Sequence, residues 1–365
     1  MSTVLSIIIL LHGIINLLGF AKVFNLAELK ELSVNISKQN GLFWLIAGIF
    51  LIFGGLLLSF ELSYWWVLAF IGAIISQIMI FKFWKFAKFG TIINFIIIVA
   101  SGIGYANFDF NKQVNNEVKI ILSQSNNNRK EILTKEKIFH LPNSIQKWIT
   151  SSGAIDKSII ENVRLEQKAF MKMSHEQKDW SEAKAIQYFT TESPALIWKV
   201  KMNMAAGLNV VGRDKFLNGK GSMLIKLLGI VPLVDSKNNT KLNEGSLQRY
   251  LAEIVWFPTA AASDYISWQA IDDTTAKATI TVKETSASGI FHFNKDSSFN
   301  SFTTMRYFGG EENSEKKEWI VSAEDYKIFN GIKIPYKVKA VWKLETGNWE
   351  WLKLEITEIN YNSIK

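Results

Sequence analysis

The sequence contains no cysteine, which excludes two ways of holding an exported domain in place. Disulfide bonds cannot stabilise it, and a lipid-modified cysteine cannot anchor it to a membrane. Histidine is also scarce, and no two of the four have the spacing of a zinc site; they are His12, His140, His175 and His292. The sequence therefore predicts neither a metal nor a cofactor.

Several motifs of catalysis and nucleotide binding are missing as well. No G-x-S-x-G nucleophile elbow occurs, and "NGKG" at residues 218–221 lacks the spacing of a phosphate-binding loop. The net charge is +8, but lysines alternate with glutamates along the second half of the chain and form no basic stripe. Nucleic acid is not an expected partner, and no nucleophile–base pair identifies a reaction.

Charged residues are absent from four long stretches in the first third of the chain. Residues 1–21, 39–60, 62–81 and 89–108 contain no Asp, Glu, Lys or Arg. Each is close to the roughly 20 residues that a helix needs to cross about 30 Å of hydrocarbon. The first block lacks the basic segment and the cleavage site of a signal peptide. The sequence therefore predicts a transmembrane domain of four helices over residues 1–110, in a bacterial inner membrane.

Lysines near the span ends predict the orientation. The loops after the first and third spans each carry three of them, whereas the turn "ELS" after the second span carries none; the lysines are Lys22, Lys30, Lys38, Lys82, Lys85 and Lys88. Because basic loops stay in the cytoplasm, the N-terminus and everything after residue 108 are expected outside it.

Polar side chains interrupt the predicted spans at a few positions. His12 and Asn16 lie one helical turn apart in the first span, and Gln77 and Asn94 lie in the third and fourth. Polar groups within a membrane often mark function, and they also join helices to one another. The sequence leaves both interpretations open.

The composition and the hydrophobic pattern change twice in the rest of the chain. Residues 111–139 are rich in Asn, Lys, Glu and Gln, which predicts a juxtamembrane linker, partly helical or mobile, with no core of its own. From about residue 162 apolar and polar residues alternate between turns such as "NGKG" and "ETGNW", as in an antiparallel sheet with one buried face. We therefore expect an α+β protein, in which the membrane helices precede an extracytoplasmic domain over residues 140–365. That domain is a large, curved antiparallel sheet, or half-barrel, with one inserted helix.

The inserted helix is expected over residues 246–260, within "LQRYLAEIVWFPTAA". Leu247, Tyr250, Leu251 and Ile254 form an apolar stripe at helical spacing. Arg249, Glu253 and Trp256 form a second line, and the sequence leaves open whether this arginine and glutamate brace the helix or face a ligand.

Arg213 and Asp214 are neighbours on a predicted strand, so they point to opposite faces of the sheet. Arg213 is expected either to be buried, for an anionic head group or an ion pair with Glu253, or to lie at a solvated strand end.

Long motifs in this half of the chain resemble a bacterial family of unknown function. They include "LPNSIQKWITSSG", "VVGRDKFLNGKGSMLIKLLGIVPLVD", "LQRYLAEIVWFPTA" and "MRYFGG", within residues 140–362. The resemblance implies no activity. The predicted plan is also similar to the half-barrels of LolA- and LppX-like lipid carriers. The family's recurrent polar and aromatic positions correspond here to Arg213, Asp214, Asp235, Arg249, Tyr250, Glu253, Trp256, Pro258 and Arg306.

Three functions are compatible with these features. The first is binding of a lipid or other hydrophobic ligand in the concave sheet under the helix, with Arg213, Arg249 or Arg306 holding an anionic head group. The second is a structural or interaction module, and the third is an enzyme acting on envelope lipid with Glu253 or Asp214 as acid or base. The candidate site residues are Arg213, Asp214, Arg249, Tyr250, Glu253, Trp256 and Arg306. The sequence does not indicate an oligomeric state.

Overall fold

The computed structural model describes residues 2–26, 36–124, 131–204, 208–309 and 313–363. Lys30, residues 125–130 of the predicted linker and Gly310 of the "MRYFGG" motif lie outside this range. The chain divides into two compact units, residues 1–112 with 228–230 and residues 113–227 with 231–365.

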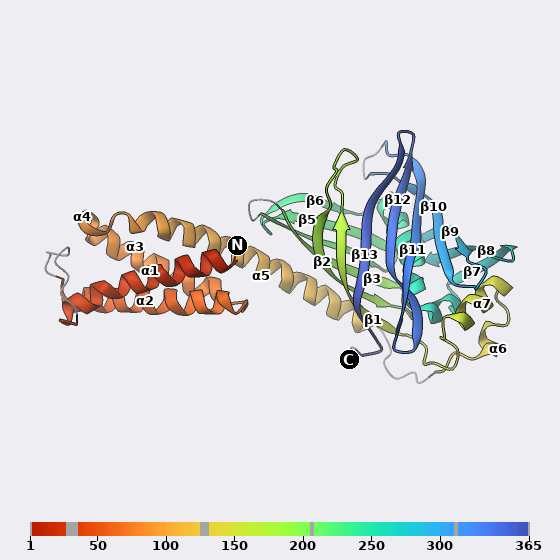
Figure 1. Cartoon of the computed structure of the whole chain (residues 1–365), viewed down its shortest axis with the longest axis horizontal. Coiled ribbons are helices and arrows are strands. Elements are labelled where there is room, and N and C mark those ends of the chain that lie inside the picture. The colour runs from red at the N-terminus through yellow and green to blue at the C-terminus, as the bar shows by residue number, and fades with distance from the viewer. Residues whose placement is uncertain (1, 27–35, 125–130, 205–207, 310–312, 364–365) are drawn as a thin grey trace. The chain divides into compact units, whose positions relative to one another are not determined.

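The first unit is helical (Figure 1). Its helices are α1 (Ser2–Val23), α2 (Lys38–Ser59), α3 (Trp65–Lys82), the short α4 (Trp84–Ala87) and the first part of α5 (Gly90–Leu122). Helices α1, α2, α3 and α5 are long and apolar enough to cross a membrane, so the predicted four spans are confirmed at this level. Glycines let α1 and α2 approach closely: a Cβ on Gly48 would lie 2.9 Å from the carbonyl oxygen of Gly13.

The polar residues of the spans meet in one buried cluster that joins three helices. The Oδ1 atom of Asn94 on α5 lies 2.8 Å from Nε2 of His12 on α1. The Nδ2 atom of Asn94 donates to Oγ of Ser76 and to Oε1 of Gln77 on α3, both at 3.1 Å. Asn16 instead donates to the carbonyl oxygen of His12 on its own helix. Asn94 is therefore the centre of the contacts between helices.

Residues 111–139 contain helical segments, and part of the first one is buried. Helix α5 continues to Leu122, and Val114, Val118 and Ile121 on it are buried. Their spacing of four and three residues is helical, but the surrounding Asn, Lys and Glu obscure it in the composition. A four-residue helix, α6 (Lys135–Ile138), and α7 (Asn143–Ser151) follow.

The second unit is built on one sheet of thirteen antiparallel strands (Figure 1). The strands are β1 (Asn162–Met171), β2 (Ser181–Thr190), β3 (Ala195–Asn203), β4 (Asn209–Leu217), β5 (Lys220–Leu227), β6 (Val231–Lys237), β7 (Ile266–Asp272), β8 (Thr275–Val282), β9 (Thr285–Phe293), β10 (Phe299–Tyr307), β11 (Lys316–Phe329), β12 (Ile332–Leu344) and β13 (Gly347–Tyr361). Their order is β6-β5-β4-β3-β2-β1-β13-β12-β11-β10-β9-β8-β7. The first and last strands pair at the centre, and β6 and β7 form the two edges. The predicted half-barrel sheet is confirmed.

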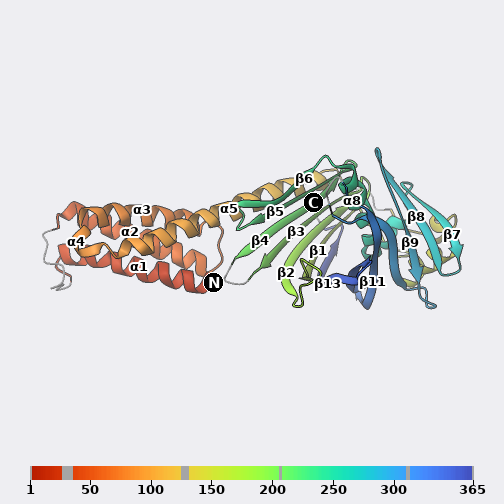
Figure 2. The ribbon, with the colours of Figure 1, turned by 90° about the horizontal axis from the view of Figure 1, so that it is seen from above.

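The connection between the two edge strands carries the inserted helix. It contains α8 (Thr240–Glu253) and two 3₁₀ helices, η2 (Ile254–Trp256) and η3 (Pro258–Ala262). Because β6 and β7 lie at opposite edges, this segment has to cross from one flank of the sheet to the other. It packs on β4 and β5 on one side and on β8, β9 and β10 on the other, inside the curve of the sheet (Figure 2).

Helix α8 begins earlier and ends earlier than the predicted 246–260. The side chain of Asn239 caps it by accepting from the backbone N–H groups of Lys241 and Leu242, which adds a turn and a half before Ser246. The α-helix ends at Glu253, and the residues before and after Pro258 form the tighter 3₁₀ turns. The predicted apolar stripe is fully buried at all four positions.

The core of the second unit lies between this crossing segment and the inward face of the sheet. Phe189 of β2 contacts Phe257 with ring centroids 4.7 Å apart, and Tyr250 of α8 with centroids 6.0 Å apart. At the other flank, Trp148 of α7 contacts Phe293 of β9 at 5.6 Å. The core therefore fixes α8 and the two flanks of the sheet relative to one another, and with them the side chains that α8 and the sheet direct toward each other.

Candidate functional site

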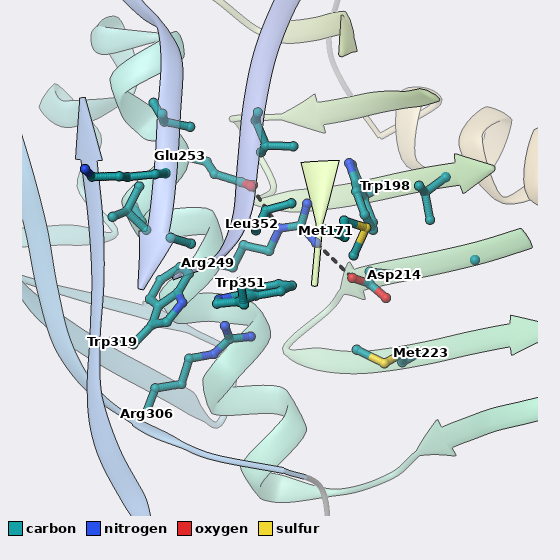
Figure 3. Close-up of a pocket in the computed structure, with 18 of the residues that line it drawn as sticks. Met171, Trp198, Asp214, Met223, Arg249, Glu253, Arg306, Trp319, Trp351 and Leu352 are labelled. Carbon is teal, nitrogen blue, oxygen red and sulfur yellow. Dashed lines mark hydrogen bonds and ion pairs between the residues drawn. The ribbon is translucent and has the colours of Figure 1, made fainter. Parts of the chain in front are cut away.

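A cavity of about 270 Å³ lies between α8 and the sheet (Figure 3). Its walls come from α8 and η2 and from strands β1, β3, β4, β5 and β10–β13. Protein interiors are packed as densely as organic crystals, and about 10–15 Å³ of such space holds one water molecule. The space is therefore far larger than a packing defect.

The lining is mainly apolar and includes four methionines. Apolar residues on the β1–β5 flank are Met171, Met173, Val200, Met202, Val210, Met223 and Ile225. Methionine side chains are flexible and polarisable, so they adapt to ligands of different shape. Met173 is 53% exposed, which places one part of the lining at the surface of the unit.

Arg249 projects from α8 and holds two carboxylates. Its Nε donates to Oε1 of Glu253, one turn further along the helix, at 2.8 Å. Its Nη1 donates to Oδ2 of Asp214 on β4, also at 2.8 Å, as the dashed line in Figure 3 shows. The guanidinium also lies over the ring of Trp198, 4.8 Å from its centroid. Three of the predicted site residues thus form one group that ties α8 to β4.

A chain of buried hydrogen bonds continues from this group and was not predicted. Gln187 donates to Oε2 of Glu253 at 2.7 Å, Gln167 donates to Oε1 of Gln187 at 3.4 Å, and Trp198 donates to Oε1 of Gln167 at 2.9 Å. Since Trp198 also lies against Arg249, the contacts close into a ring. The sequence does indicate that these two glutamines are unusual, because both occupy inward positions of alternating strands, where apolar residues are expected.

Burial and pairing act in opposite directions on these charges. Burial raises the pKa of Asp214 and of Glu253, and the positive charge of Arg249 only partly offsets it. Burial also disfavours the charge on Arg249, but Glu253 and Asp214 outweigh it and raise the pKa of the guanidinium. The arginine stays charged, and the two carboxyl groups are the members of the group that can take up a proton.

Arg306, on β10, lines the same cavity but has a different environment. Its guanidinium lies over the ring of Trp319, 4.6 Å from the centroid, and 5.8 Å from the centroid of Trp342. A Cβ on Gly245 of α8 would lie 3.2 Å from its Nε. Burial, and then the charge of Arg249, lower the pKa of Arg306 from 12.5 to about 10.

The remaining predicted residues do not join this group. Arg213 points to the other face of β4, where Nε lies 3.0 Å from Oε2 of Glu117 on α5. It is buried, so the expectation of a solvated strand end is wrong, and its ion pair is not with Glu253. The hydroxyl of Tyr250 donates to the carbonyl oxygen of Thr190 in the core. Trp256 touches the cavity, but its Nε1 donates to the carbonyl oxygen of Pro335.

The described residues contain no group of three or more His, Cys, Asp or Glu side chains that could hold a metal ion. The charged side chains that line the cavity are Arg249 with its two carboxylates, Arg306, and Lys339. Nζ of Lys339 lies 3.5 Å from Oε1 of Glu324 and 3.8 Å from Oε2 of Glu350.

Comparisons with known proteins place the second unit in a family. A search of curated proteins found no match. Among solved structures, a LolA superfamily protein from Nitrosomonas europaea is similar, with 10% identity, 60% of this chain and 94% of that chain covered, and a TM-score of 0.34. The model of a family of unknown function, DUF6920, matches residues 139–361. This match covers the sheet and the crossing helix, and the chain belongs to that family.

Proposed function

We propose that the second unit binds a hydrophobic ligand in the cavity between α8 and the sheet. The observation that carries this proposal is a space of about 270 Å³ with a mainly apolar lining. Ligand sites are commonly concave and apolar, with a few polar groups, and measure about 300–1,000 Å³. A volume near the lower end of that range fits one hydrocarbon chain better than a lipid with several chains.

The ring around Arg249 supports this role as a frame for the cavity. It connects α8 to β4 and, through Gln187 and Gln167, to β2 and β1. Breaking a buried ion pair by removing one partner costs about 3–5 kcal/mol. Such a frame keeps the helix at a fixed distance from the sheet, so the space under it persists without a side chain to fill it.

The hydrogen bonds of the two carboxylates favour ligand binding over catalysis as the function of the cavity. Asp214 and Glu253, the acids of the described lining, both accept from Arg249, and Glu253 also accepts from Gln187. The described lining supplies no serine, threonine, cysteine or histidine as a nucleophile or base. The geometry suits a site that holds a molecule rather than one that transforms it.

Photocrosslinking of the full-length protein in lipid nanodiscs tests the proposal. A dodecyl chain with a terminal diazirine should label peptides of β3, β13 and α8, identified by tandem mass spectrometry. The Ala340→Phe substitution on β12 puts a large side chain into the cavity and should abolish this labelling. The matched control is Lys337→Phe on the same strand, because Lys337 does not line the cavity. Labelling confined to α1–α5, or equal in the two variants, would exclude a ligand site under α8.

We also propose that residues 1–110 anchor the protein in a bacterial inner membrane, with the N-terminus and residues 140–365 on the extracytoplasmic side. The lysine distribution supports this orientation, and the absence of cysteine makes it easy to test. In spheroplasts, an impermeant maleimide should label the Ser63→Cys and Thr346→Cys variants. The Lys88→Cys variant should react only after the membrane is permeabilised. Immediate labelling at position 88 with protection at 346 would reverse the orientation.

A further inference from the structure

Arg306 is a cation that the described part of the protein leaves without an acceptor. No described residue forms a hydrogen bond or an ion pair with its guanidinium; Trp319 and Trp342 contact it only through their ring faces. Asp214 and Glu253 attract it from beyond ion-pair distance. Arg306 is only partly exposed, and a positive charge that is largely removed from water normally has a partner, since its desolvation costs several kcal/mol.

The other arginines that could serve the cavity are already used. The charge of Arg249 is paired with two carboxylates, those of Asp214 and Glu253, and Arg213 pairs with Glu117 on the other face of the sheet. Of the three arginines that the sequence offers for a head group, Arg306 alone reaches the cavity with its donors uncommitted among the described residues.

The surroundings of Arg306 hold it in place while leaving the charge available. The guanidinium lies over the ring of Trp319 and close to Gly245, so contact with a flat and a small group restricts its position. The buried Nε1 atoms of Trp319 and Trp351, which also line the cavity, have no acceptor among the described residues. Figure 3 shows Arg306 with no dashed contact, in contrast to Arg249. This part of the lining has more donors than acceptors.

We propose that Arg306 binds the anionic group of a single-chain amphiphile whose hydrocarbon chain lies along the methionine-rich side of the cavity. The inference rests on the proposed function and specifies its ligand class. A carboxylate or a phosphate monoester accepts hydrogen bonds in the fork geometry of a guanidinium. The remaining lining, from Met171 to Met223, offers the chain an apolar surface.

A competition experiment separates the head group from the chain. Full-length protein in nanodiscs is labelled with the diazirine probe in the presence of dodecanoate, dodecyl phosphate, dodecanol or dodecyltrimethylammonium. For each competitor, the half-effective concentration is compared between the wild type and Arg306→Met. Because a competitor partitions into the disc equally with either protein, the ratio reports on the cavity alone.

Arg306→Met should raise the half-effective concentration of dodecanoate and dodecyl phosphate about tenfold or more, the effect of losing a charge-assisted hydrogen bond. It should affect dodecanol and the cationic amphiphile far less. Arg306→Lys should keep part of the preference for anions. Arg164→Met is the matched control; it removes one positive charge from β1, where Arg164 pairs with Glu166 and Glu358, and should leave dodecanoate competition unchanged.

The outcomes distinguish the two proposals. If Arg306→Met weakens dodecanoate, dodecyl phosphate and dodecanol equally, or if the wild type shows no preference for anions, the assignment of Arg306 is wrong while the ligand site stands. If no competitor reduces labelling of β3, β13 and α8, the hydrophobic site itself is wrong. A response to dodecyl phosphate without one to dodecanoate would support the assignment with phosphate as the recognised group.

Discussion

Arg249 and Glu253 are joined across one turn of α8, with Nε 2.8 Å from Oε1, at a place where Glu253 is buried and the side chain of Arg249 is only 14% exposed. In water such a pair contributes only about 0.2–0.5 kcal/mol. Here Asp214 shares the same guanidinium and Gln187 supports the carboxylate, so the three charges and one amide act as a unit.

A double-mutant cycle on this pair should show strong coupling. Arg249→Met leaves two buried carboxylates without a cation and should cost about 3–5 kcal/mol, or about 6–20 °C in the thermal midpoint of the second unit. Adding Glu253→Gln removes one of those carboxylates, so the double variant should lose less than the sum of the single variants. Tryptophan fluorescence of the full-length protein in detergent measures the midpoints. The partly exposed pair Glu350–Lys353 on β13 is the control, with coupling of about 1 kcal/mol (about 4 °C) or less. Additive losses at Arg249 and Glu253 would contradict the buried ring.

The stability of the protein should depend on pH in the way expected for carboxyl groups with a raised pKa. Burial raises the pKa of Asp214 above 3.8 and that of Glu253 above 4.5. Between the ordinary and the raised values the folded state binds more protons than the unfolded state, so these groups make stability fall as pH rises. Asp214→Asn should therefore reduce the fall in midpoint as pH rises above 3.8, the ordinary pKa of an aspartate carboxyl.

Asp272 provides a control of opposite sign for that experiment. The backbone N–H of Thr274 lowers the pKa of this exposed carboxyl, so its contribution is present at neutral pH and lost as pH falls. Asp272→Asn should make the fall in midpoint with rising pH slightly steeper. An unchanged pH profile in Asp214→Asn would show that this carboxyl is not titrating in the buried site.

Arg306→Met should stabilise the protein in the absence of ligand. Burial, and then Arg249, lower the pKa of the guanidinium to about 10, so at neutral pH the folded state carries a charge that it disfavours. Replacing that charge with an apolar side chain should raise the midpoint by about 2–12 °C, the equivalent of about 1–3 kcal/mol. Arg164→Met should not raise it, because that arginine has two carboxylate partners. A lower midpoint in Arg306→Met would mean that the cation supports the fold.

Asn94→Leu should weaken the contacts between α1, α3 and α5. Asn94 lies within hydrogen-bonding distance of His12, Ser76 and Gln77, and hydrogen bonds between membrane helices contribute about 0.6 kcal/mol on average, up to about 2. Unfolding of the full-length protein in increasing dodecyl sulfate should occur at a lower fraction of dodecyl sulfate. Ser59→Ala is the control, since Ser59 bonds only within α2 among the described residues. Equal resistance in both variants would show that the cluster does not join the helices.

The parts of the fold that depend on composition and period could be predicted from the sequence. Four charge-free stretches and a period of two are properties of single segments, so the apolar helices and the antiparallel sheet follow from them. The boundaries of α8 were harder to predict, because the segment before it contains several residues that can cap a helix, and only the structure shows that Asn239 accepts the backbone N–H groups.

The site was predicted as a set of residues but not as a set of contacts. Arg213, Arg249 and Arg306 look equivalent in the sequence, and their roles depend on which strands and helices meet. Arg213 meets Glu117 because α5 continues past the predicted span, and Arg249 meets Asp214 because α8 crosses to β4. Gln167 and Gln187 occupy inward-facing positions of alternating strands, so the sequence indicates that they are buried. It does not indicate why, because only the structure shows that the carboxylate of Glu253 lies beside Gln187.

The pairing of β1 with β13 makes the middle of the sheet the last part to be completed during synthesis. Strands β1–β6 can form hairpins as the chain emerges, but β1 keeps an open edge until residues 347–361 arrive. Contacts between such distant segments slow folding because a long loop has to close first. A nonsense mutation that removed β13 would therefore divide the sheet at its centre. The two remaining sets of antiparallel strands would be connected only by the segment that contains α8.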